Sequence, residues 1–295
     1  MKNRALILSI LFLLGCRQRE IEFNLPYDGD KLIVYAIFSP NEPLSVKLTK
    51  TYPPVGQVIY IYIKDAEVLV YEDGKFLERL KYEKDDNYIS ETGYKPKVGS
   101  KYSLKVNAVG FPSVETNEEV IPTKPNVTYF DFSQDIESAL NDWKKAKKLI
   151  LKLKDEEEKQ NFFLLNGYAY WNNQKTGIST GFGISQPNEF ILPCLNFYIG
   201  SAIINNDCFQ NNSYTYERGY EIDRFFMGYS TQRVQKMEFF VRQINKSYYD
   251  FCKTYYEEED LLKAFNSPNP RYSNIKGGYG IFSAYNEVKF EALIK

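Results

Sequence analysis

The stretch that decides the fold class is Lys31-Leu-Ile-Val-Tyr-Ala-Ile-Phe38, which is rich in β-branched and aromatic residues and ends at Ser39-Pro40. Next along the chain, Leu44-Ser-Val-Lys-Leu-Thr-Lys50 alternates apolar and polar residues, as a strand with one buried face does. Lys101-Tyr-Ser-Leu-Lys-Val-Asn107 repeats that alternation. Several short strands at this spacing predict an immunoglobulin-like β-sandwich over residues 31–122.

A hairpin supports this prediction. Ala66-Glu-Val-Leu-Val-Tyr71 and the run from Phe76 to Tyr82 flank the turn Glu72-Asp73-Gly74-Lys75. The region contains no Cys and no Trp, so the disulfide and tryptophan pattern of antibody domains is absent.

A second domain is expected over residues 123–295, because two prolines in Ile121-Pro-Thr-Lys-Pro-Asn126 interrupt both helix and sheet. Val127 to Phe132 and Asn161 to Trp171 are typical of strands. We therefore expect a second β-rich, sandwich-like domain with one or two short helices.

Two segments are candidates for those helices. The first is marked by apolar residues at helical spacing, namely Ile136, Ala139, Leu140 and Trp143. The second begins at Ser247, which has capping-box spacing to Asp250. Its apolar stripe is Tyr248, Phe251, Cys252 and Tyr255, which we interpret as core rather than as a binding site.

Composition excludes several classes of function. The 295 residues include 37 Lys+Arg and 38 Asp+Glu, and this net charge of -1 argues against nucleic acid as a partner. Histidine is absent, which removes the commonest metal ligand and every nucleophile activated by histidine. Tyr, Phe and Trp make up 16% of the chain, a load that suits strands and contact surfaces but that an AT-rich coding bias would also produce.

The first 15 residues are typical of a lipoprotein signal peptide. Lys2 and Arg4 precede the apolar run from Ala5 to Leu14, which is too short to span a membrane. The run leads into Leu13-Leu14-Gly15-Cys16, which resembles the bacterial lipobox. We expect Cys16 to be the acylated N-terminus, residues 16–30 to form a lipidated tether and the protein to be anchored to the membrane; an ordinary secretory peptide is the alternative.

No motif predicts a catalytic, metal or cofactor site. Gly177-Ile178-Ser179-Thr180-Gly181 matches the letters of a nucleophile elbow, but without a histidine base Ser179 is expected to be dispensable. Zinc is not expected, because histidine and a CxxC pair are both absent. The abundant carboxylates leave a glycosidase-type pair open, although no local pattern identifies one.

Three cysteines remain after Cys16. Cys194 and Cys208 flank the polar loop from Asn205 to Asn212, so we expect them to form a disulfide in an exported chain. Cys252 is then a buried free thiol, although it could replace either partner.

Scattered segments together resemble a Bacteroidetes lipoprotein family labelled domain of unknown function 4249. The resemblance rests on six segments of this sequence: the lipobox with Ile21-Glu-Phe-Asn-Leu-Pro26, Lys31 to Tyr35, Ile63 to Val68 with its Glu72-Asp73-Gly74 turn, Val98 to Val106 with the Ile121-Pro122 joint, Ser247 to Phe251, and Asn274-Ile-Lys-Gly-Gly-Tyr-Gly-Ile-Phe282. It implies an outer-membrane lipoprotein with a β-sandwich first domain, often encoded near TonB-dependent transporters. It implies no catalytic residues.

Two functions follow as hypotheses. In the first, the protein is a non-enzymatic accessory lipoprotein that contacts an outer-membrane protein through the aromatic-rich second domain, with no cofactor. In the second, it is an anchored protein that binds or hydrolyses glycans with paired carboxylates. The ligand and the membrane face, periplasmic or outward, stay open.

Overall fold

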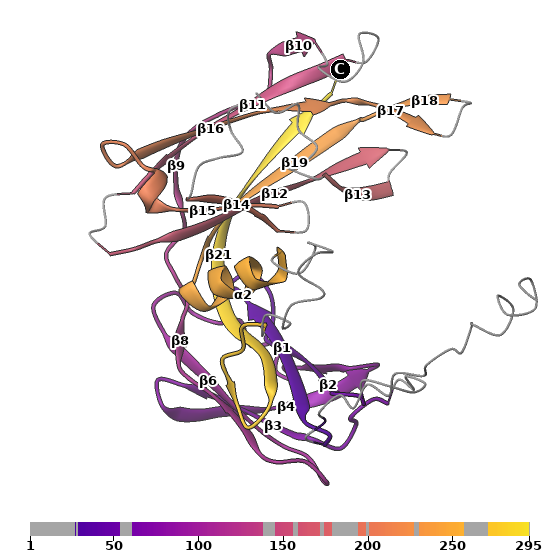
Figure 1. Ribbon diagram of the computed structural model, residues 1–295, viewed down its shortest axis with the longest axis vertical. Coiled ribbons are helices and arrows are strands. Elements are labelled where there is room, and N and C mark those ends of the chain that lie inside the picture. The colour runs from indigo at the N-terminus through magenta and orange to yellow at the C-terminus, as the bar shows by residue number, and fades with distance from the viewer. Residues whose placement is uncertain are drawn as a thin grey trace, which may run out of the picture.

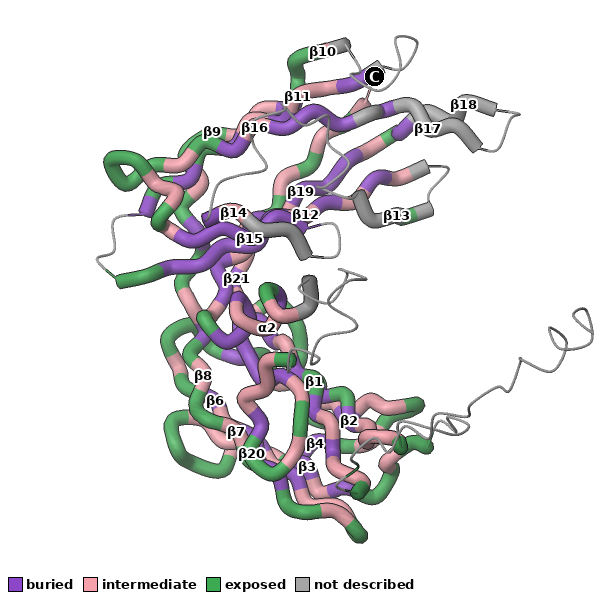
Figure 2. The backbone as a smooth tube through the Cα atoms, in the orientation of Figure 1, coloured by how far each residue is buried: buried purple, intermediate pink, exposed green. Residues whose placement is uncertain are grey.

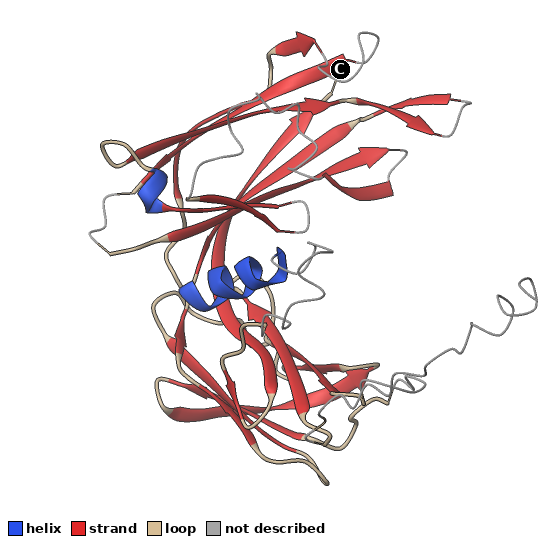
Figure 3. Cartoon of the chain, in the orientation of Figure 1, coloured by secondary structure: helices blue, strands red, loops and turns tan. Residues whose placement is uncertain are grey.

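The protein consists of two β-rich bodies joined by one long strand (Figure 1). The computed structural model describes residue 27 and residues 29–53, 61–137, 145–155, 159–171, 174–178, 194–198, 201–226, 230–256 and 271–294. Strands dominate these residues (Figure 3), so the expected mainly β, sandwich-like class is confirmed.

The first domain curls its strands around one core. Its strands are β1 (Leu32–Phe38), β2 (Ser45–Lys50), β3 (Glu67–Glu72), β4 (Lys75–Lys84), β5 (Asn87–Ile89), β6 (Lys101–Asn107), β7 (Val114–Thr116) and β8 (Glu119–Val120). Strand order is β1-β2-β5-β4-β3-β6-β7, and β8 pairs with β6. Every second residue of β1, from Leu32 to Phe38, is buried, as the alternation predicts. Tyr88 and Tyr102 are also buried, and their hydroxyls donate to the Ile63 carbonyl and to Glu72.

The C-terminal strand completes this first domain. β20 (Ile275–Lys276) pairs with β7, and β21 (Tyr279–Leu293) pairs in parallel with β1. Gly280 permits this approach, because a Cβ atom there would lie 1.9 Å from the Val34 carbonyl oxygen. Ile275, Phe282 and Ala284 therefore belong to the first core. The expected boundary between residues 31–122 and 123–295 needs this correction, since residues 275–284 pair back onto the first domain.

The second domain has two layers. Its strands are β9 (Asn126–Asp131), β10 (Asp135–Glu137), β11 (Lys145–Lys154), β12 (Phe162–Trp171), β13 (Gln174–Ile178), β14 (Leu195–Tyr198), β15 (Ser201–Asn205), β16 (Ser213–Glu221), β17 (Asp223–Phe226), β18 (Ser230–Arg233) and β19 (Lys236–Ile244). One layer has the strand order β14-β15-β12-β19-β21. In the other layer, β11 pairs with β9, with β10 and with β16. A core of aliphatic side chains and rings lies between the layers, and Figure 2 shows buried residues along the strands of both layers.

One α-helix, α2 (Lys246–Tyr256), lies between the two domains within the described residues (Figure 1). It starts one residue earlier than expected, because the Asn245 carbonyl accepts the N–H groups of Tyr248 and Tyr249. Ser247 is therefore inside the first turn instead of capping it, and its hydroxyl lies 2.7 Å from that of Ser283. The helix packs over Phe162, Leu164 and Ile244 of the adjacent sheet.

The other expected helix is wrong at Ile136. This residue lies in β10, where it pairs with Ala146 of β11, because the sheet ladder satisfies its backbone groups. Ala139, Leu140 and Trp143 lie outside the described residues.

Candidate contact face

Strand alternation gives the second domain a face that points away from its core. In β12, Phe163, Leu165 and Ala169 enter the core. Tyr168 and Tyr170 therefore point to the opposite side, since neighbouring side chains of a strand alternate. Adjacent strands add to this side in register, because Tyr168 is opposite Glu238 of β19, which in turn is opposite Glu291 of β21.

We call this surface the outer face. It is formed by Tyr168, Tyr170, Glu238, Phe240, Arg242, Tyr285, Glu287 and Lys289. Helix α2 covers the end of the same sheet face nearest the first domain, where Phe162 and Ile244 contact Tyr248, Tyr249 and Cys252. Beyond the helix the side chains change from apolar to aromatic and charged.

Cations lie over the aromatic rings of the outer face. The Lys175 ammonium is 3.9 Å from the ring centre of Tyr168, and that of Lys236 is 4.3 Å from the ring centre of Tyr170. The Arg242 guanidinium is 4.7 Å from the ring centre of Tyr285. These distances are typical of cation–π contacts. These contacts hold the rings and the long side chains in place.

Ion pairs hold the charged side chains of the outer face in fixed positions. Glu238 accepts from Lys236 and Lys289, both at 2.8 Å, and from the Tyr170 hydroxyl at 2.6 Å. Burial alone would raise the pKa of Glu238, but these three donors outweigh it and lower the pKa to about 2. Glu238 is therefore ionised at neutral pH, which suits a fixed charge and not a general acid.

The aromatic pattern continues onto the first domain along β1 and β21. Tyr35 is 41% exposed and meets the Phe251 ring of α2 edge-on at 6.2 Å. Tyr279 is 45% exposed, with the Lys31 ammonium 5.5 Å from its ring centre. Half-exposed aromatic rings thus extend along one side of both domains.

A polar cluster joins the two domains beside α2. Glu119 of β8 accepts from the side chains of Asn245 and Asn274. Burial raises the pKa of Glu119 above its ordinary value. Hydrogen bonds with Ser247, Asn245 and Asn274 lower the pKa but only partly offset the effect of burial. A shallow hollow of about 430 Å³ borders this cluster. Three segments far apart in sequence therefore meet at one half-buried carboxyl.

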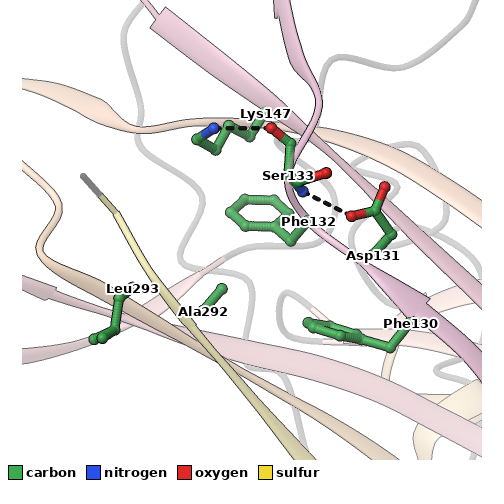
Figure 4. A pocket seen from close by; sticks show the side chains of 7 residues that line it. All are labelled: Phe130, Asp131, Phe132, Ser133, Lys147, Ala292 and Leu293. Atoms are coloured by element: carbon green, nitrogen blue, oxygen red, sulfur yellow. Dashed lines mark hydrogen bonds between the residues drawn. The ribbon is translucent and has the colours of Figure 1, made fainter.

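Two further hollows lie at the second domain. One, of about 360 Å³, is lined by Phe130, Phe132 and Ala292, with Lys147 bonded to the Ser133 carbonyl on its rim (Figure 4). Phe130 stacks on Phe290 at 4.5 Å. The other, of about 720 Å³, lies at the Cys194–Cys208 disulfide and has mainly polar side chains. Neither places an activated nucleophile beside a base.

The structure joins Cys194 and Cys208 by a disulfide, the pair expected from the sequence. Cys252 is a free, fully buried thiol on α2, and its burial raises the pKa of the thiol. It is thus packed as core.

Cys16 and Ser179 lie outside the described residues, so lipidation of the first and dispensability of the second stay predictions. Across the ranges that the structure describes, no three acidic or Cys side chains come together as a metal site. No helix in the described part of the chain has the length and apolar character to cross a bilayer.

Sequence reasoning located aromatic density in the second domain but did not identify the outer face. The signal was the alternation Tyr168-Ala-Tyr170 opposite Lys236-Met-Glu-Phe-Phe-Val-Arg242. In each strand, every second residue faces the core, and the residues between them are Tyr, Phe, Lys, Arg and Glu. Pairing the two strands correctly required the structure.

Comparison with known proteins identifies a family and little else. Residues 18–291 match the family described as "Domain of unknown function (DUF4249)". No curated protein matches the chain. A solved structure described as "Putative membrane anchored protein from Corynebacterium diphtheriae" aligns at 11% identity and a TM-score of 0.19, over 74% of this chain and 55% of that one. That likeness is too low to indicate a shared fold.

Proposed function

The chain belongs to the DUF4249 family, and we propose that it is a lipid-anchored, non-enzymatic accessory protein of the outer membrane. It works by contact with an outer-membrane protein, such as a TonB-dependent transporter. The outer face of β12, β19 and β21 provides the contact surface. The observation that carries this proposal is the set of aromatic rings paired with cations on that face.

Contact chemistry favours this surface. Tyr and Arg are common energetic anchors of protein interfaces. Tyr supplies a large contact area with few rotatable bonds, and both side chains donate hydrogen bonds. Tyr168, Phe240 and Tyr285 are each partly exposed, so a partner could bury more of them. A lipid on Cys16 would confine the chain to the membrane and raise its effective concentration toward a membrane partner.

Glycan hydrolysis has less support. A glycosidase pair needs one carboxyl with a raised pKa as acid and a second as base or nucleophile. On the outer face, the pKa of Glu238 is lowered, and Glu287 is paired with Arg242 at 2.8 Å. The ammonium groups over Tyr168 and Tyr170 also cover ring surface on which a sugar would stack.

The test is affinity purification of the tagged full chain from detergent-solubilised native membranes, with and without cross-linker. We expect an outer-membrane protein to co-purify with the wild type and to be lost with Tyr168→Ala combined with Phe240→Ala. Tyr129→Ala is the matched control, because Tyr129 is 46% exposed but lies on β9, in the other layer. Recovery of the lipoprotein alone, or equal loss with the control, contradicts the proposal.

A further inference from the structure

The end of the tether is fixed to the first domain. The Thr51 N–H donates to the Lys31 carbonyl at 2.9 Å, and the Lys31 N–H donates to the Thr51 hydroxyl at 2.9 Å. Asp30 forms an ion pair with Lys50 and accepts from the Tyr27 hydroxyl. Asp30 and Lys31 are therefore held at a defined place, beside the end of β2.

Exposed aromatic and apolar side chains surround that place. We call this group the exit patch; it is formed by the exposed Tyr27, Ile61 and Tyr62 and by the partly buried Lys31, Lys50 and Tyr52. Tyr27 and Tyr62 are each 39% exposed and Ile61 is 48% exposed. The Tyr52 hydroxyl accepts the Ile61 N–H at 3.3 Å, and the Lys50 ammonium lies 5.5 Å from the Tyr52 ring centre. The patch is thus one connected surface.

This combination of side chains suits the interface of a bilayer. Tyrosine places an apolar ring and a polar hydroxyl at the level of the headgroups. The Lys50 ammonium is paired with Asp30, so the lysine stems border the rings and the rings would make the contact with lipid. An isoleucine among them adds apolar area that water would otherwise cover.

The length of the tether brings the patch to the membrane. Ten residues lie between Cys16 and Tyr27, so a lipid on Cys16 holds the patch within about 40 Å of the bilayer even when the segment is fully extended. We propose that the exit patch lies against the lipid surface, so that the acyl chains and the patch together fix the orientation of the body. This inference rests on the lipid anchor of the proposed function.

The orientation has a consequence for the contact face. β1 starts beside the exit patch, and β21 runs parallel to it from Tyr279 to Leu293. Fifteen residues of strand span about 50 Å, so β21 leads from the membrane-facing end to the far end of the second domain. A partner would then meet the outer face alongside the molecule, above the lipid surface.

The experiment places a single tryptophan in the full lipidated chain. Trp143 and Trp171 are replaced by Phe, and Tyr62→Trp is compared with Tyr129→Trp, which puts the probe on the second domain at similar exposure. Each protein is reconstituted into phosphatidylethanolamine and phosphatidylglycerol vesicles with brominated acyl chains. We expect tryptophan at position 62 to lose most of its emission relative to unbrominated vesicles, and tryptophan at position 129 to keep its emission.

A second variant distinguishes stable contact of the exit patch with the bilayer from random collisions of the probe with lipid. Ile61→Asp, added to Tyr62→Trp, introduces a charge at an exposed site and should restore the emission. Flotation of each vesicle sample reports the anchor independently. Vesicles that carry the protein without quenching at position 62, or with equal quenching at both positions, overturn the exit patch and leave the anchor intact. Protein that does not float with vesicles overturns the anchor itself.

Discussion

The two domains have similar, mainly aliphatic cores but are closed by different means. The first core contains Tyr88 and Tyr102, which are bonded through their hydroxyls, and the C-terminal strand completes it. The second core contains a group of rings that includes Phe132 and Phe239, and a disulfide ties its edge. The sheet of the second domain carries the aromatic and charged side chains of the outer face, and the exposed rings of Tyr35 and Tyr279 continue this pattern on the first domain.

This difference indicates that the two domains have separate roles. The first domain is held by the pairing of β1 with β21, two strands far apart in sequence. The second domain has its own covalent tie and can present a contact surface without using its core residues. Changes in the first domain should therefore affect folding, whereas changes on the outer face should affect binding.

The largest effect is expected from Gly280→Ala. The backbone there has a φ of +115°, and a Cβ would meet the Val34 carbonyl oxygen at 1.9 Å. Strain and the forced separation of β1 from β21 should together cost about 4 kcal/mol of the free energy of unfolding. Gly74→Ala is the control, because Gly74 also has positive φ but has no atom within 4 Å, and it should cost about 1 kcal/mol. Equal urea midpoints for the two variants would show that β21 does not clamp the first domain.

Removal of the disulfide should act on the second domain. Cys194→Ser with Cys208→Ser opens a loop of about 15 residues, which costs about 3 kcal/mol in the chain-entropy model. Hydrogen exchange should rise in β14 and β15 and stay unchanged in β1 and β2. Mass mapping of the wild type under non-reducing conditions is the first check, and three unpaired thiols there would remove the basis of this prediction.

Local patterns made much of the first domain predictable. The expected strands at Lys31–Phe38 and Lys101–Asn107 correspond to β1 and β6 almost residue for residue, because period-two alternation is written into each strand. The partner of β1 was not predictable, since β21 comes from the other end of the chain. The sequence shows several glycines between Asn274 and Phe282. The structure gives the reason for them, because the backbone there lies too close to β1 and β7 for a side chain.

The outer face shows the same limit. Aromatic density over residues 161–256 was visible, yet which rings enter the core depends on strand register. The helix prediction failed at Ile136 because this residue pairs with Ala146 of β11, a contact that the spacing of apolar residues cannot reveal.

Two carboxyls should give opposite pH effects, smaller than those above. The pKa of Glu119 is raised by burial, so its stabilising contribution is present at low pH and is lost as pH rises through that pKa. Glu238, with its pKa lowered to about 2, contributes stability above its unfolded pKa and loses it as pH falls toward 2. At neutral pH, Glu119→Gln should therefore raise the unfolding midpoint or leave it unchanged, and Glu238→Gln should lower it. The same direction for both variants would contradict the assigned environments.

The smallest effect is expected from Ser179→Ala. The chain has no histidine, so no imidazole can take a proton from this hydroxyl, and its glycine neighbours are typical of a turn. The variant should match the wild type in unfolding midpoint and in the amount of partner captured from membranes. Tyr168→Ala with Phe240→Ala, run in parallel, should keep the midpoint nearly unchanged while losing the partner. If Ser179→Ala instead abolished an activity of the folded protein, the contact model would give way to a chemical one, since a hydroxyl with no role in contact would then be required.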